Sequence, residues 1–225
     1  HRALYEEKSL LQAWSFRGVP AVFPTQDSDV FLCALKGRAH EQPWIYTRGI
    51  TLALERLGLT VQQLWPLVES AARECLRGCA VTGKPALDTA VAALAAPHLP
   101  AEAQPVWNSP SPYGRPDVQT LGGAAVSFLL RPCAFERLVV FGRREGALPT
   151  FTSPKAWLGR PLPPPRADAA LQLVRRFLHC YGPATPAALQ SWLGACPARH
   201  PAGRARPAPA SRRCGPPASR AAFRA

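Results

Sequence analysis

The chain has 225 residues, of which 47% are hydrophobic, and this supports one or two domains with a packed core. Its formal net charge of +13 favours a polyanionic partner such as DNA. No run of about 18 apolar residues occurs, which excludes a membrane-spanning helix, and no signal-peptide pattern opens the chain. Because the chain begins with His1 and contains no Met, we expect an internal fragment of a longer protein.

The first part of the chain is predicted to form a hairpin followed by helices. Two short apolar runs joined at Arg17-Gly18 predict a β-hairpin over Leu10–Thr25. Asp27 or Ser28 is expected to cap a short helix that follows. Three more helices have recognisable boundaries: residues 50–58 ending at Gly58, residues 61–78 between the cap residue Thr60 and Gly78, and residues 84–95 with Pro85 in the first turn.

The middle of the chain is predicted to be a loop followed by one helix. Pro97–Gly123 is rich in proline and is expected to be a loop, with Trp107 and Tyr113 packed against the body. Residues 121–138 return to a helical pattern, which Pro132 is expected to bend or end.

A second hairpin and two helices are expected in the next part of the chain. Residues 138–153 combine an apolar strand, a charged turn and alternating Thr and Phe, which predicts a hairpin with a basic tip. After a Pro-rich linker, Asp168 is expected to cap one helix. Thr185 is expected to cap the next, with Pro186 at its first position.

The order of these elements predicts the fold class. The order helix, helix, loop, helix, basic hairpin occurs once in full, from about Thr60 to Ser153. We expect an α+β fold, mainly α, made of tandem winged-helix modules, in which the third helix enters the major groove of DNA and the hairpin contacts phosphates. Residues 1–58 would be the end of a first module with connecting helices, 59–160 a complete second module, and 161–195 the first helices of a third.

The last segment, 196–225, has a different composition. It contains seven Arg and no acidic residue, so it contributes +7, and most of the rest is Ala and Pro. Such a sequence cannot bury a core, and we expect it to be disordered. It would suit a basic DNA-binding arm. The favoured alternative is a shifted reading frame in GC-rich DNA, since the change follows a well-formed helix start abruptly.

The seven Cys are irregularly spaced, which is typical of a protein in the reducing cytoplasm. Cys33, Cys133 and Cys180 stand among apolar or aromatic residues and are expected to be buried thiols. Cys75 and Cys79 lack a second Cys or His pair at zinc spacing, so no metal site is expected.

Four stretches, in order and covering roughly Leu10–Gly194, resemble one family. They are "QAWSFRGVPAVFPTQD", "QTLGGAAVSFLLRPCAFERLVVFGRREGALPTFTSPKAWLG", "LVRRFLHCYGPATPAALQSWLG" and, more loosely, the helix around Trp65. They are similar to the winged-helix DNA-binding-domain proteins that include the AlkZ-like DNA glycosylases of bacteria.

The resemblance implies tandem winged-helix modules, usually three, followed by a small β-rich region. It also implies hydrolysis of the N-glycosidic bond of alkylated or crosslinked bases, with no metal or organic cofactor. Alkylation makes a purine positively charged and therefore a good leaving group. Such an enzyme must mainly position a water and stabilise the developing sugar cation.

The family's catalytic signature is Gln-x-Gln or Gln-x-Asp in the first module, upstream of the stretch that matches "WSFRG". No Gln of this chain has Gln or Asp two residues later. We therefore expect the signature to be missing by truncation, and no catalytic residue is assigned.

Seven cations are candidates for contacts to DNA: Arg17, Arg131, Arg143, Arg144, Lys155, Arg175 and Arg176. The first and second hairpin tips hold Arg17 and the Arg143–Arg144 pair, and Lys155 follows the second hairpin. Hairpin cations often bind phosphates, although turns are charged in many proteins.

The remaining candidates have ordinary structural roles as their main alternative. Arg131 is expected to form a salt bridge with Glu136 or another acid. Arg175 and Arg176 lie opposite an apolar stripe of their helix, formed by Leu171, Val174 and Leu178, so a solvated face is expected first. His179 is expected to be a packed structural residue.

Two functions from different classes remain open. The chain is either a fragment of a DNA repair glycosylase or a non-catalytic DNA-binding regulator or scaffold of the same architecture. Both imply double-stranded DNA as partner, alkylated or crosslinked in the first case. We expect a cytoplasmic monomer without a membrane partner. In a third reading, the truncated chain forms nothing stable by itself.

Overall fold

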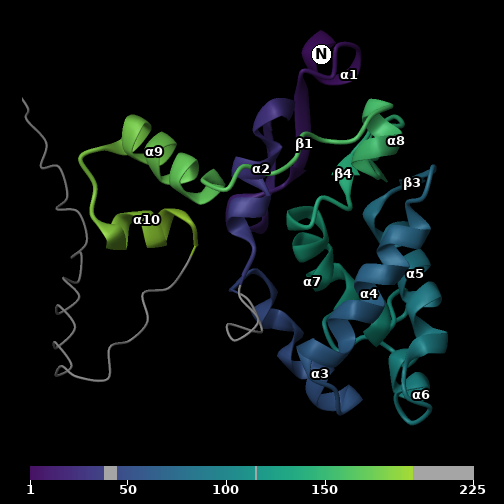
Figure 1. The fold of residues 1–225 in the computed structure, drawn as a ribbon. Helices are drawn as coiled ribbons and strands as arrows, with labels where there is room; N and C mark the ends of the chain where they lie inside the picture. Colours follow the sequence, from purple (N-terminus) through teal and green to yellow (C-terminus); the bar gives the residue numbers. More distant parts are fainter. Residues whose placement is uncertain (38–44, 115, 195–225) are drawn as a thin grey trace, which may run out of the picture.

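The computed structural model describes residues 1–37, 45–114 and 116–194 (Figure 1). Helices α4, α5 and α7 lie side by side, with short helices at one end and small strands at the other. Helices α9 and α10 lie to one side of this body. The predicted tail, 196–225, is outside the described residues. No helix of the described part is long and apolar enough to cross a membrane.

The predicted first hairpin is confirmed. Strands β1 (Leu10–Trp14) and β2 (Pro20–Pro24) pair antiparallel, with Trp14 opposite Pro20. Leu11 and Ala13 point into the body and are fully buried. Between the strands lies the 3-10 turn η1 (Phe16–Gly18). In this turn Arg17 has a φ of 60°, a left-handed conformation that residues other than Gly, Asn and Asp rarely adopt.

The elements that flank this hairpin and lead to the long helices are short. They are α1 (Arg2–Tyr5), η2 (Thr25–Asp27), α2 (Ser28–Phe31), η3 (Cys33–Leu35), η5 (Ile45–Ile50) and α3 (Thr51–Leu57). The expected stop at Gly58 is confirmed, because this residue follows α3 in the left-handed conformation. The expected side-chain cap of α2 is wrong. Asp27 is the N-cap residue, but its carboxylate binds arginines instead of the helix end.

The helix predicted after Thr60 is α4 (Val61–Cys75). Thr60 and Gln63 form a capping box, in which each side chain accepts from the other residue's backbone N–H. The helix ends at Cys75, before Gly78, because strand β3 (Ala80–Thr82) follows. This strand was not predicted. Helix α5 (Lys84–Ala95) has Pro85 in its first turn as expected.

The second hairpin joins β3 in a small sheet. Strands β4 (Val140–Phe141) and β5 (Thr150–Thr152) pair antiparallel, and β5 also pairs with β3, which gives the order β3-β5-β4. The turn η6 (Ala96–His98) follows α5, and α8 (Pro154–Leu158) follows the sheet.

The region 97–123 is not simply a loop. It contains helix α6 (Ala103–Trp107), and Trp107 packs inward as predicted, with 1% of its surface exposed. The indole N–H of Trp107 donates to the Ala92 carbonyl at 3.0 Å. The Tyr113 hydroxyl, also directed inward, accepts from the Ala53 N–H at 2.9 Å.

Helix α7 (Leu121–Phe135) is the central helix of the core. All its residues except Ser127, Phe128 and Arg131 are buried. Pro132 does not end the helix, which continues to Phe135. The partly exposed residues of α7 are Ser127, Phe128 and Arg131. The expectation that this third helix enters a DNA groove stays a prediction.

Helix α9 (Ala169–Tyr181) and helix α10 (Pro186–Trp192) follow the linker. Thr185 caps α10 as predicted, accepting from the Ala188 N–H at 3.2 Å, whereas the Asp168 side chain does not cap α9. The predicted apolar stripe of α9 is also wrong. Leu171 and Leu178 are 50% and 44% exposed, and the buried face is instead Ala169, Leu173 and Phe177.

Because the buried face of α9 differs from the predicted one, the predictions that His179 and Cys180 are buried are also wrong. His179 and Cys180 lie on its open side and are exposed. Of the other thiols expected to be buried, Cys133 is buried and Cys33 is half-buried.

Candidate nucleic-acid interface

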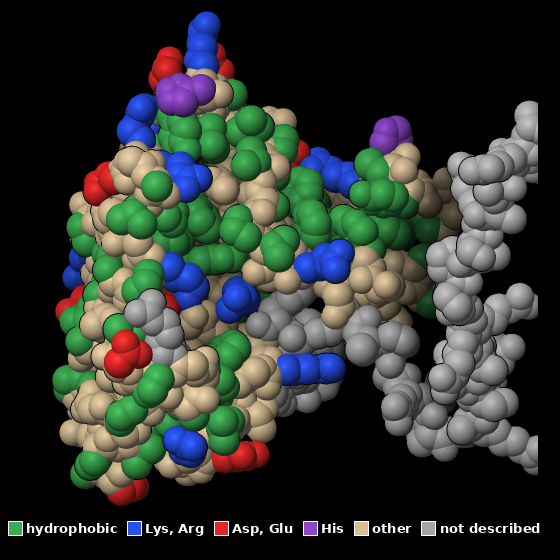
Figure 2. All heavy atoms as spheres, turned by 180° about the vertical axis from the view of Figure 1, so that it is seen from behind, with side chains coloured by type: hydrophobic (Ala, Val, Ile, Leu, Met, Phe, Trp, Pro, Cys, Tyr) green, Lys and Arg blue, Asp and Glu red, His purple; other side chains and the backbone are tan. Residues whose placement is uncertain are grey.

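The seven predicted cations lie at four separate places. Arg17 and Arg131 line one pocket, Arg143 and Arg144 lie at the second hairpin tip, Lys155 lines a groove, and Arg175 and Arg176 belong to α9. Figure 2 shows one face of the molecule, on which Lys and Arg side chains are scattered among hydrophobic ones. The positive charge therefore forms several local sites rather than one stripe.

The pocket at the first hairpin brings three arginines together. Arg17 from the hairpin turn, Arg48 from η5 and Arg131 from α7 line a pocket of about 400 Å³. Arg17 and Arg48 are exposed. Arg48 was not predicted, because nothing in the surrounding sequence marks it and only the packing of η5 on α7 brings it here.

The salt bridge expected between Arg131 and Glu136 is wrong, and the other acid that acts on Arg131, Asp88, does so through its charge without an ion pair in the described part. Arg131 donates from Nε to the Gly18 carbonyl at 3.3 Å and from Nη1 to the Ser127 carbonyl at 2.9 Å, while Glu136 pairs with Lys36. Burial lowers the pKa of the Arg131 guanidinium, and the Asp88 carboxylate opposes this shift. Arg131 thus ties α7 to the hairpin turn.

Lys155 lines a wider groove on another part of the body. This groove of about 820 Å³ also contains three arginines and Glu136. Two of the arginines are already engaged: Arg73 pairs with Glu69 at 3.1 Å, and Arg137 donates to the Pro163 carbonyl at 2.6 Å. The groove is therefore less available to an anion than the number of its cations suggests.

The second hairpin tip presents two exposed arginines. The Arg143 guanidinium lies over the Tyr5 ring, 5.3 Å from its centroid, and Arg144 donates to the Ala147 carbonyl. Glu145 follows these two arginines in the chain, immediately before the turn. Its carboxylate accepts a hydrogen bond from the Thr82 hydroxyl. Both arginines keep donors free to meet phosphate.

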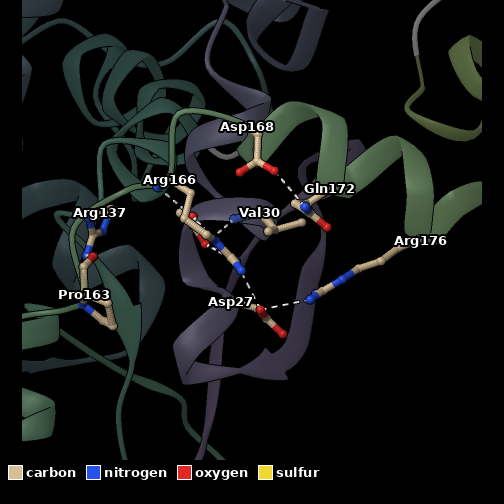
Figure 3. Close-up of polar contacts among 9 residues, drawn as sticks. Asp27, Val30, Arg137, Pro163, Arg166, Asp168, Gln172 and Arg176 are labelled. Atoms are coloured by element: carbon tan, nitrogen blue, oxygen red, sulfur yellow. Dashed lines mark hydrogen bonds and ion pairs between the residues drawn. The ribbon is translucent and has the colours of Figure 1, made fainter.

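On α9 the two arginines have different roles. Arg175 is exposed, whereas Arg176 pairs with Asp27 at 2.9 Å and lies over the Phe31 ring. Figure 3 shows Arg166 of the linker and Arg176 of α9 both directed at Asp27. The solvated face expected for Arg176 is thus wrong, and this residue docks α9 against the hairpin region.

Asp29 completes this docking network. Arg166 donates to its carboxylate from Nε and Nη2, both at 2.8 Å. These hydrogen bonds hold the pKa of Asp29 at about 2, against the opposing effect of burial. Burial also opposes the shift at Asp27, but hydrogen bonds from Arg176 and Arg166 lower the pKa of its carboxyl.

The part of the chain that the structure describes offers no cluster that would hold a metal. Within the described ranges, no group of three or more His, Cys, Asp or Glu side chains is arranged for an ion. The buried carboxylate of Asp88 is bound by Lys84 at 2.9 and 3.0 Å and belongs to the helical core. The chemistry that the described surface supports is the binding of anions by guanidinium groups.

Comparisons with known proteins show which family the chain belongs to. The family model described as DNA glycosylase AlkZ-like matches residues 1–214. A solved structure, Streptomyces sahachiroi DNA glycosylase AlkZ, is similar to the chain with a TM-score of 0.52 and 21% identity. The similarity covers 86% of this chain and 49% of that one, so the chain spans about half the length of that relative. None of the curated proteins compared with the chain matches it. The chain belongs to the AlkZ-like DNA glycosylase family.

Proposed function

We propose that the chain binds duplex DNA and is part of a DNA repair glycosylase that removes alkylated bases. The observation that supports this most is the family match over residues 1–214. The net charge of +13 and the exposed arginines of the two hairpins fit a partner with a phosphate backbone.

We further propose that residues 59–160 form a winged-helix module, with 1–58 and 161–195 belonging to its neighbours. The order α4, β3, α5, α7, β4, β5 with β5 in the middle of the sheet supports this proposal. Of α7, the proposed contact to DNA comes from Arg131, which is only partly buried, and the other proposed contacts come from cations around the module.

A non-catalytic DNA-binding protein is the second candidate. Its support is that folds of this kind bind DNA without chemistry in many proteins, and that no catalytic residue is assigned in this sequence. Such a protein would bind DNA through the same cations and release no base.

One experiment separates the two candidates. The full-length product of the gene that encodes this chain is incubated with a duplex that contains an alkylated purine, and both the bound fraction and the free base are measured. Binding with base release supports the glycosylase, and binding without release supports the second candidate. If the duplex is not bound at all, both proposals are wrong.

A further inference from the structure

The pocket of Arg17, Arg48 and Arg131 is unusual in its charge. Its lining holds three guanidinium groups and no carboxylate: Arg17, Gly18, Val19, Arg48, Gly49, Phe128, Arg131 and Gly194. Three like charges around one small space repel each other unless an anion lies between them. The Asp88 carboxylate, whose charge acts on Arg131, is already bound by Lys84.

Within the described ranges, two of these arginines have no competing ion-pair partner. Neither the Arg17 nor the Arg48 guanidinium forms an ion pair with any residue of the described part. Arg131 uses Nε and Nη1 for the two carbonyls, and no hydrogen bond of Nη2 occurs within the same residues. Donors from three different elements are thus available to one ligand.

The pocket is also held in shape before a ligand arrives. The turn that carries Arg17 is closed by two backbone hydrogen bonds, from Gly18 to Ser15 at 2.9 Å and from Ser15 to Val19 at 3.0 Å. The Ser15 hydroxyl, itself in a buried residue, fixes this turn to the Phe31 carbonyl at 2.6 Å. A preorganised set of donors binds with a smaller loss of conformational entropy.

We propose that Arg17, Arg48 and Arg131 together form a binding site for one phosphate group of the DNA backbone. Guanidinium groups bind phosphate oxygens through paired N–H donors, which suits three arginines around one tetrahedral anion. Gly49 allows η5 to pack closely on α7, since a Cβ there would lie 2.5 Å from the Phe128 ring, and this close packing brings Arg48 next to Arg131. This site rests on the proposed DNA binding. It places one contact to DNA at the junction of the first hairpin, η5 and α7.

The test uses the full chain and substitutions that keep the local backbone. Arg17→Asn removes the charge with a residue that tolerates a positive φ, and Arg48→Gln removes it from η5. Arg56→Gln on α3 is the matched control, since this exposed arginine lies outside the pocket. Affinity for an undamaged duplex is measured at several salt concentrations, and thermal melting verifies that each variant is folded.

Each pocket variant should bind DNA roughly 3–10-fold more weakly, equally for different sequences. It should also reduce the salt dependence by up to about 1 in the slope of log affinity against log salt. Arg48→Lys, which keeps the charge, should retain the slope. If both pocket variants bind like the control, with the wild-type slope, the phosphate site is refuted while DNA binding stands. If the wild type itself does not bind the duplex, the site and the DNA-binding function are both refuted.

Discussion

At the scale of single residues, the helical core contains a buried carboxylate with a matched cation. Asp88 on α5 is 4% exposed, and Lys84, one turn earlier, binds both its oxygens and also the Ser127 hydroxyl. Burial raises the pKa of Asp88, and Lys84 opposes this shift. A buried charge that loses its partner costs much more than the pair contributes.

Lys84→Met should therefore destabilise the protein by about 1–3 kcal/mol in urea unfolding at neutral pH. Adding Asp88→Asn should restore part of this loss. Without Lys84, the folded-state pKa of the Asp88 carboxyl would lie even further above its unfolded-state pKa. The loss of unfolding free energy should therefore shrink as the pH falls, because the carboxyl becomes protonated and neutral. Lys36→Met breaks a more exposed pair with Glu136 and should have a small effect. Equal losses for the two variants would contradict this role of Asp88.

Gly122 tests the packing of the core at another residue. A Cβ at this position would lie 2.3 Å from the Trp107 ring, which is buried and cannot move away. Gly122→Ala should thus cost about 1–3 kcal/mol of unfolding free energy. A Cβ on the neighbouring Gly123 would meet only ordinary contacts at 3.5 Å, so Gly123→Ala should be neutral or stabilising. A neutral Gly122→Ala would show that the ring is not held as described.

Side-chain roles were predictable where the partner is close in sequence. Thr60 and Thr185 cap their helices because the N–H groups they accept from lie three residues away. Asp27 fails as a cap because Arg166 and Arg176, far along the chain, bind its carboxylate instead. Arg48 could not be found from the sequence for the same reason, since its site exists only after η5 packs on α7.

At the scale of elements, the parts that tertiary contacts create were missed. Strand β3 has only three residues and is a strand because Ala80–Thr82 pairs with Thr150–Thr152. The buried face of α9 is chosen by its packing on α2 and η3, which turns Leu173 inward and leaves Leu178 outside. Hairpins and long helices, whose signals are local, were predicted correctly.

The docking of α9 depends on Asp29. Asp29→Asn removes the charge that two nitrogens of the Arg166 side chain bind, so α9 should exchange its amide hydrogens faster at neutral pH. Asp168→Asn at the start of α9, where the carboxylate accepts from Gln172 on the exposed surface, is the control. The measurement is hydrogen exchange of residues 169–181 by mass spectrometry. If these residues exchange at the wild-type rate in Asp29→Asn, the docking role of Asp29 is contradicted.

The contact between Asp29 and Arg166 also makes the docking of α9 depend on pH. The folded pKa of Asp29, about 2, is below its ordinary value of 3.8, so its stabilisation is complete above pH 4 and is lost as pH falls toward 2. Pepsin should therefore cleave residues 169–194 of Asp29→Asn faster than those of the wild type at pH 4. At about pH 2 the two should be cleaved alike. A difference that grows toward pH 2 has the wrong sign for this account.

At the scale of the whole molecule, the mainly helical body with small sheets follows from hydrophobic periodicity and turn residues that are visible in the sequence. The distribution of charge over that body does not. Seven cations taken from the sequence as one group are divided by the fold into a hairpin pocket, a hairpin tip, a groove and a docking contact. Their availability for DNA is decided by protein partners such as Asp27, which lie far away in sequence.

The most direct test of the central claim is the affinity of the full chain for an undamaged DNA duplex at about 50 and 200 mM salt. If the arginine pocket and the hairpin tip contact separate phosphates, counterion release predicts at least a roughly tenfold loss of affinity over this range. An affinity that does not change with salt, or no binding at either concentration, would contradict the account.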